Sequence, residues 1–216
     1  MAENTIESTP TRADLTRERI LEAAEIVFAR RGLDGTRVRE IAAAAEVNGA
    51  TLYTYFPSKR LLYEAVLERG LQPLLAVLAE FSGGPEDVEQ LLQAAMQHLA
   101  GRPQISRLIY LEIISEGGYL PDLAQRWFRP LLQRVLGQLE AGADSSPWDE
   151  SMFPLVATAF LHLGFGHFVL APLFREVFDR DPLSPETVAH QTQFLVQMVR
   201  QMFPLPAGPP EGAEEP

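Results

Sequence analysis

Residues 36–59 read TRVREIAAAAEVNGATLYTYFPSK, and this stretch predicts the fold of the N-terminal part of the chain. Thr36 is a suitable N-cap for a first short helix, and Asn48 is a suitable N-cap for a second one. The spacing of the apolar residues directs Leu52 and Phe56 of the second helix towards the core. Two short helices joined by a tight turn form a helix-turn-helix, whose second helix has the right size for the major groove of DNA.

The outward side of this second helix carries small and hydroxyl-bearing residues. Such residues allow close approach to DNA and hydrogen bonds with phosphates and base edges. They are Gly49, Ala50, Thr51, Tyr53, Thr54 and Tyr55. For Tyr53, packing against the neighbouring helices is the alternative.

Four segments resemble the DNA-binding domain of the TetR family of bacterial transcriptional regulators. They are residues 20–32 (ILEAAEIVFARRG), 36–42 (TRVREIA), 47–56 (VNGATLYTYF) and 57–59 (PSK), and the likeness extends over about residues 16–67. The resemblance implies an all-α fold with two parts. An N-terminal three-helix, helix-turn-helix DNA-binding domain is joined to a C-terminal helical ligand-binding and dimerisation domain. It implies a regulator that is not an enzyme and needs no cofactor.

The sequence departs from the family pattern at two places. Glu46 stands in the turn where the family usually has Gly, because that residue tends to be left-handed; a side chain there costs about 1 kcal/mol. Its negative charge is expected to weaken DNA binding slightly. Arg60 and Leu61 follow Lys59 where acidic residues are common, and this change favours phosphate contact.

The resemblance also implies which residues meet DNA. Arg39 is the leading candidate for reading a base, because an Arg can bond a guanine through two parallel donors; a solvated surface Arg is the alternative. Tyr55 and Lys59 are expected to hold phosphates, joined by Thr36 and Arg37 at a helix N-terminus. The complete predicted set is Thr36, Arg37, Arg39, Asn48, Gly49, Ala50, Thr51, Tyr53, Thr54, Tyr55 and Lys59. The expected partner is a roughly palindromic double-stranded operator bound by a homodimer.

The distribution of charge agrees with this interpretation. The formal charge is −11, but residues 1–70 contribute only −1 and the remainder contributes −10. The basic residues therefore concentrate in the predicted DNA-binding part, and the acidic part should lie far from the phosphates. The chain has no Cys, which excludes disulfides, thiolate metal sites and a Cys nucleophile, and favours a cytoplasmic protein. The first 13 residues are polar and lack the apolar core of a secretion signal.

The pattern of helices and breaks predicts four regions along the chain. They are a disordered arm (1–13), the DNA-binding domain (14–60), the ligand-binding and dimerisation domain (61–203) and a disordered tail (204–216). A first helix is expected to begin after Thr16 and to end at Gly32. Further helices are expected from residue 58 with a kink or break at Pro73, and over 86–99, 105–116, 121–139 with a bend at Pro130, 151–174 and 185–203. Residues 83–85 and 142–147 read as a turn and a loop.

Residues 152–174 contain no Asp, Glu, Lys or Arg. A membrane anchor is one interpretation of such a stretch, and a helix buried in a soluble core is the other. The family resemblance favours the second and implies that the last two helices pair with their copies in a second subunit. The predicted interface residues are Ala157, Leu161, Gly164, Phe168, Leu195, Val199 and Met202.

Glu112 shares a helical face with apolar residues, where a carboxylate is costly unless it is paired. It could meet a cationic or hydrogen-bonding ligand with the help of Glu116, or form an internal pair with Arg102, Arg107 or Arg134. A remote alternative is an α-helical enzyme that uses Glu112 and Glu116 as acid and base. The predicted pocket for an unknown small-molecule inducer comprises His98, Tyr110, Glu112, Glu116, Trp127, Phe128, His162 and Phe165. No catalytic or metal site is predicted, since His162 and His167 lie on different faces of a helix.

Overall fold

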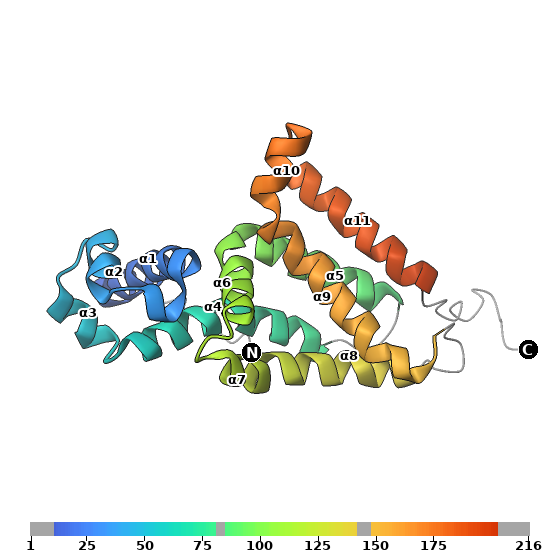
Figure 1. Ribbon diagram of the computed structural model, residues 1–216, viewed down its shortest axis with the longest axis horizontal. Coiled ribbons are helices and arrows are strands. Elements are labelled where there is room, and N and C mark those ends of the chain that lie inside the picture. Colours follow the sequence, from blue (N-terminus) through green and yellow to red (C-terminus); the bar gives the residue numbers. More distant parts are fainter. Residues whose placement is uncertain (1–10, 81–84, 142–147, 203–216) are drawn as a thin grey trace, which may run out of the picture.

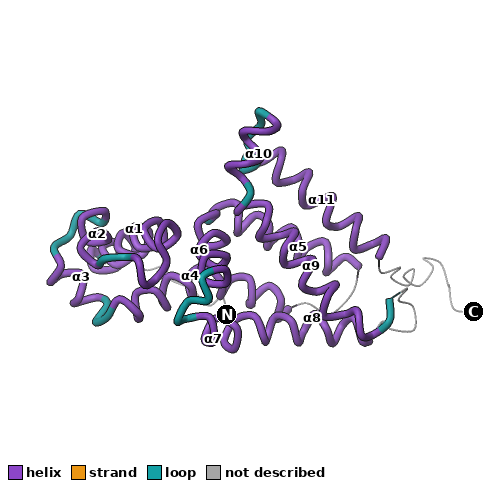
Figure 2. Tube along the Cα trace, viewed as in Figure 1, coloured by secondary structure: helices purple, strands orange, loops and turns teal. Residues whose placement is uncertain are grey.

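The computed structural model describes residues 11–80, 85–141 and 148–202, and it contains helices and no strand within these ranges (Figures 1 and 2). This confirms the all-α prediction. Of the predicted arm (1–13), turn (83–85), loop (142–147) and tail (204–216), residues 1–10, 83–84, 142–147 and 204–216 lie outside the described residues, whereas Arg12, Ala13 and Pro85 belong to helices. The elements are α1 Arg12–Gly35, α2 Val38–Ala44, α3 Gly49–Tyr55, α4 Lys59–Glu80, α5 Pro85–Gly101, α6 Pro103–Ile114, α7 Leu120–Leu123, the π-helical η1 Ala124–Phe128, α8 Arg129–Ala141, the 3-10 turn η3 Glu150–Met152, α9 Phe153–Val169, α10 Ala171–Phe178 and α11 Pro185–Met202.

Helices α1, α2 and α3 form a head at one end of the molecule, and α4 leads from the head into the body (Figure 1). The head is also fixed to the body through α1, which packs against both α4 and α6. The body is built from the remaining helices: α5 packs against α4 and α11, while α9 packs against α6 and α8. The buried core runs through both parts, so movement of α4 or α6 bears directly on the head.

Helix α1 begins earlier than expected, at Arg12. The Thr11 hydroxyl accepts a hydrogen bond from the Asp14 amide (3.2 Å), and the Asp14 carboxylate accepts one from the Thr11 amide (2.9 Å). This reciprocal cap gives hydrogen-bond partners to two backbone amides at the start of the helix. Thr16 is not a cap, because its hydroxyl donates within the helix to the Arg12 carbonyl. The hydrogen bonds from Thr11 also hold the pKa of Asp14 below its ordinary value.

The first helix was predicted to end at Gly32, but α1 is only kinked there and continues to Gly35. Gly32 has φ +68°, a left-handed value that a side chain disfavours, and it interrupts the regular helical backbone of α1. Leu111 of α6 lies against this position. The change of direction therefore occurs where the head contacts the body.

The two helix interruptions expected at Pro73 and Pro130 are not found at these prolines. Pro73 does not break α4, which continues to Glu80, because Leu71, Leu74 and Leu75 pack against the core on both sides of the proline. In the 121–139 segment the irregularity is η1, just before Pro130, rather than a bend at the proline. The Arg129 amide bonds to the Ala124 carbonyl, five residues back. Because Pro130 has no amide hydrogen to donate to the carbonyl four residues earlier, the turn before it widens into the π-helical η1.

The apolar segment 152–174 is not one helix. Helix α9 ends at Val169, and α10 leaves its axis at Leu170, with Pro172 in the first turn of α10 (Figure 1). Within the described residues, Glu150–Val169 is long and apolar enough to cross a membrane by composition, a property shared by core helices of soluble proteins. At the end of helix α6, the side chains of Ile113 and Ile114 are exposed.

Candidate nucleic-acid interface

Helices α2 and α3 form the predicted helix-turn-helix. Asn48 caps α3 through its side-chain oxygen, which accepts a 2.7 Å hydrogen bond from the Thr51 amide. Glu46 in the turn has φ +54°, so the left-handed conformation expected at this position is confirmed. Leu52 and Phe56 are buried in the core, as predicted. These contacts fix the orientation of α3 against α1 and α2.

Helix α3 presents its predicted polar side to solvent. Gly49, Ala50 and Thr54 are exposed, and Tyr53 is 49% exposed, so the alternative in which Tyr53 packs into the head is wrong. Thr51 and Tyr55 are half-buried. The exposed hydroxyl groups are therefore available to DNA without any rearrangement of the helix.

Thr36 does not have its predicted role. It is 3% exposed, and its hydroxyl donates a 2.7 Å hydrogen bond to the Gly32 carbonyl. The N-cap of α2 is Arg37, whose side chain makes no capping bond. Thr36 thus stabilises the end of α1 and cannot offer its hydroxyl to a phosphate.

A hollow beside α3 gathers most of the predicted basic groups. It is lined by Thr36, Arg37, Val38, Arg39, Tyr53 and Lys59. Arg37 and Arg39 are exposed and, among the described residues, have no ion-pair partner. The Lys59 ammonium donates to the Thr36 carbonyl (3.1 Å) and the Asp34 carbonyl (3.4 Å), which leaves one of its three hydrogens free. The cations therefore converge on one side of the recognition helix.

Arg60 was expected to favour phosphate contact, and its position contradicts this. Its guanidinium pairs with Asp122 of α7 and Glu64 of α4 and lies 5.2 Å from the centroid of the Tyr119 ring. The side chain is directed to the body, so Arg60 holds α4 against α7.

The predicted ligand-pocket residues do not form one site. Trp127, Phe128 and Phe165 come together with Leu71, Leu74, Leu75 and Leu131 around a cavity of about 20 Å³. The His98 ring bonds to the Gly70 carbonyl, and the Tyr110 hydroxyl lies 2.8 Å from His162 Nδ1, joining α6 to α9; none of these three residues lines the cavity. The indole nitrogen of Trp127 is buried and has no hydrogen-bond partner in the part of the chain that the structure describes.

Glu112 does not pair with an arginine within the described residues. Its oxygens accept hydrogen bonds from the Tyr63 hydroxyl (2.8 Å) and the Tyr119 amide (2.7 Å), all inside the core. Glu116 is exposed and occupies a left-handed turn position with φ +46°. The internal pairing expected for Glu112 is right in kind but wrong in its partners, because the donors are neutral groups.

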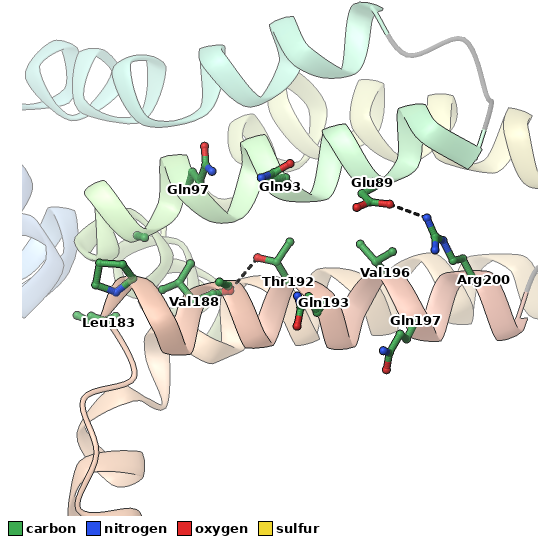
Figure 3. A pocket seen from close by; sticks show the side chains of 13 residues that line it. Glu89, Gln93, Gln97, Leu183, Val188, Thr192, Gln193, Val196, Gln197 and Arg200 are labelled. Atoms are coloured by element: carbon green, nitrogen blue, oxygen red, sulfur yellow. Dashed lines mark hydrogen bonds and ion pairs between the residues drawn. The ribbon is translucent and has the colours of Figure 1, made fainter.

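A groove in the body was not anticipated from the sequence. It lies between α5 and α11, has a volume of about 730 Å³ and is bordered at one end by the Glu89–Arg200 ion pair (2.6 Å). Figure 3 shows Val188, Thr192 and Val196 of α11 directed towards α5. The only signal in the sequence is a pair of Gln repeats at helical spacing, 93 and 97 on α5 and 193 and 197 on α11. Helices so distant in sequence cannot be paired from such a signal.

The predicted dimer residues need correction. Ala157, Phe168 and Leu195 are buried within a single chain, so they cannot form the surface between two chains. Leu161, Gly164 and Val199 are half-buried, and the side chain of Met202 lies outside the described ones. The exposed apolar side chains of these last helices are Leu155, Leu170, Leu173, Val177, Phe178 and Phe194.

Comparison with known proteins agrees with the geometry of the head. Residues 20–66 match the family model of bacterial regulatory proteins of the tetR family, and residues 85–199 match the tetracyclin repressor-like C-terminal domain. The chain is 32% identical over 151 residues to the HTH-type transcriptional repressor SCO4008 of Streptomyces coelicolor, which covers 68% of this chain and 77% of that protein. It is 36% identical over 109 residues to the transcriptional regulator RutR of Escherichia coli, and this match spans half of each protein (48% and 50%).

Solved structures share the complete fold. The hemolysin II transcriptional regulator HlyIIR superposes with a TM-score of 0.61 at 25% identity, covering 85% of this chain and 98% of that one. SCO4942 from Streptomyces coelicolor gives a TM-score of 0.61 at 28% identity, covering 88% and 99%. These relatives are regulators rather than enzymes, which removes the enzyme interpretation of Glu112 and Glu116. The chain belongs to the TetR family of bacterial transcriptional regulators, and its head is a helix-turn-helix DNA-binding domain.

Proposed function

We propose that the protein is a dimeric repressor that binds a roughly palindromic operator through α3 and is released by a small molecule. The observation that carries the DNA-binding mode is the exposed side of α3 with Arg37, Arg39 and Lys59 gathered beside it. A helix of this size enters the major groove, where its outward residues meet base edges. Arg39 reads a base, while Lys59 and Tyr55 hold phosphates.

The dimer is formed by the last helices of the body, α9, α10 and α11. Leu155 of α9, Phe194 of α11 and the apolar side of α10 are exposed in the single chain, and a second copy would cover them. Figure 1 shows that α10 projects beyond the other helices. A two-fold axis through this region presents two heads to DNA and imposes two-fold symmetry on the operator.

The inducer site is the cavity at Trp127. Its lining is apolar and comes from α4, η1, α8 and α9, and the buried indole hydrogen offers one donor. The ligand class is therefore an apolar molecule with one hydrogen-bond acceptor. A cavity of about 20 Å³ must open to admit it, which separates α4 from η1. A ligand that prefers this open state lowers DNA affinity, and DNA lowers ligand affinity by the same factor.

The protein acts in the cytoplasm, where its operator lies. Fractionation without detergent tests this: recovery in the membrane pellet would favour the anchor interpretation of residues 152–174.

The test of DNA binding is a titration of the protein with its own upstream DNA and with a scrambled duplex. Arg39→Ala should reduce the preference between the two by about 1–3 kcal/mol for each of the two half-sites, the typical contribution of a bidentate base contact. The control is Arg107→Ala, an exposed arginine on α6 that should leave both affinities unchanged. Equal binding of both duplexes by the wild type, or an unchanged preference in Arg39→Ala, would contradict the assigned role.

A further inference from the structure

We propose that Arg12 and Arg19 of α1 form a second phosphate site, which holds the DNA strand on the side of α3 opposite Lys59. The inference rests on the proposed docking of α3 in the major groove. It adds two contact residues that lie outside the helix-turn-helix.

A second hollow adjoins α3. It is lined by Arg12, Ala13, Thr16 and Arg19 of α1, Glu46, Val47 and Asn48 of the turn, and Thr51 and Tyr55 of α3. In the first hollow, which contains Arg37, Arg39 and Lys59, the residue contributed by α3 is Tyr53. Thr51 and Tyr55 are four residues apart and share one face of the helix, whereas Tyr53, two residues from each, lies on the opposite face. The two hollows therefore flank α3 on opposite sides.

This arrangement matches the surroundings of a helix in a major groove. The groove is about 12 Å wide and is bordered by the sugar-phosphate backbones of both strands. A helix lying in it has one strand on each side. The hollow with Arg37, Arg39 and Lys59 faces one strand, and the hollow with Arg12 and Arg19 faces the other.

The arginines of the first turns of α1 differ in their availability. The Arg17 guanidinium lies 5.3 Å from the centroid of the Phe56 ring and 3.6 Å from the Glu18 carboxylate. Arg12 and Arg19 are exposed, and neither guanidinium has an ion-pair or hydrogen-bond partner within the described residues. Their charges are therefore free for phosphates, together with the hydroxyl groups of Thr51 and Tyr55.

The same hollow contains an opposing charge. Glu46 is exposed and lines it from the turn. A carboxylate here reduces the attraction for a phosphate without reading any base. The site thus predicts that Glu46 lowers affinity for all sequences alike.

The experiment measures DNA affinity of the full chain against salt for the double variant Arg12→Gln/Arg19→Gln. Each lost phosphate contact reduces the slope of log K against log salt by about 0.9, so losing two contacts in each of the two heads of the proposed dimer should decrease the slope by about 3.6. Binding to the upstream duplex and to a scrambled duplex should weaken by similar factors. The matched control, Arg107→Gln/Arg129→Gln, removes two exposed charges from the body and should leave the slope unchanged.

A second variant keeps the test independent of α1. Glu46→Gln retains the side-chain length and removes the charge, and it should raise affinity for both duplexes several-fold at low salt. An unchanged slope in the double variant, or no gain in Glu46→Gln, overturns the second site while wild-type binding supports the proposed function. Absence of wild-type binding to any duplex contradicts the proposed function itself.

Discussion

The Tyr63 hydroxyl donates a 2.8 Å hydrogen bond to Oε2 of Glu112, and this bond joins α4 to α6 inside the core. The other carboxylate oxygen accepts the Tyr119 amide, just before α7. Three elements of the body thus meet at one buried carboxylate. Because α4 begins directly after the helix-turn-helix, the position of the head depends on this junction.

Tyr63→Phe should destabilise the protein by about 1–3 kcal/mol, since it leaves a buried carboxylate oxygen without its donor. Urea unfolding followed by circular dichroism measures the difference. Tyr53→Phe is the matched control, because its hydroxyl is on the exposed side of α3. Equal stability of the two variants would show that the bond contributes nothing.

Stability should also fall at alkaline pH through Tyr63. Burial, followed by the hydrogen bond to Glu112, raises the pKa of Tyr63 above its ordinary value of 10.0. A folded-state pKa above the unfolded one stabilises the fold below pH 10.0, and this contribution is lost as the pH rises further. Unfolding free energies at about pH 9 and about pH 11 should differ more in the wild type than in Tyr63→Phe. Parallel pH profiles would contradict the prediction.

Two glycines within helices should respond oppositely to alanine. A Cβ at Gly70 of α4 would lie 2.4 Å from Ile105 Cδ1, whereas nothing lies within 4 Å of one at Gly137 of α8. Gly70→Ala should therefore cost about 1–3 kcal/mol through overpacking. Gly137→Ala should stabilise by up to about 1 kcal/mol through helix propensity. Thermal unfolding of both variants measures the difference, and a shift of the same sign in both would refute the argument.

Glu46→Gly should stabilise the head by about 1 kcal/mol, because glycine accepts the left-handed backbone without strain. Glu46→Gln keeps that strain and should leave the stability unchanged. Comparing the two variants by chemical unfolding separates the backbone effect from the charge. Equal stabilisation by both would assign the effect to the charge.

The sequence predicted those features that depend on neighbouring residues. The Asn48 cap and the buried Leu52 follow from spacing within one turn of helix, and the left-handed Glu46 follows from the family resemblance. The roles of Thr36 and Arg60 were missed because each depends on a distant or alternative partner. Asp122 lies 62 residues from Arg60, and no pattern within the sequence connects them.

The predicted body was correct in most of its helices, although Pro73 does not break α4 and the segment 151–174 forms two helices, and it was incomplete in its sites. Residues 127, 128 and 165 were grouped correctly because large aromatic side chains collect in a helical core. Glu112 was recognised as a buried carboxylate, but its donors are a tyrosine hydroxyl and a backbone amide, which charge patterns do not reveal. The α5–α11 groove depends on the crossing of two helices, and that geometry is set by packing.

The side chain of Lys59 is already ordered in the free head, and this order bears on the rate and affinity of operator binding. Its ammonium is already tethered to two carbonyl oxygens at the junction of α1 and α2. A flexible lysine loses rotamer freedom when it is immobilised on a partner, which typically opposes binding by about 0.5–1.5 kcal/mol. Here most of that ordering is already present in the free chain, so in the proposed binding mode the side chain would meet a phosphate in a preorganised state.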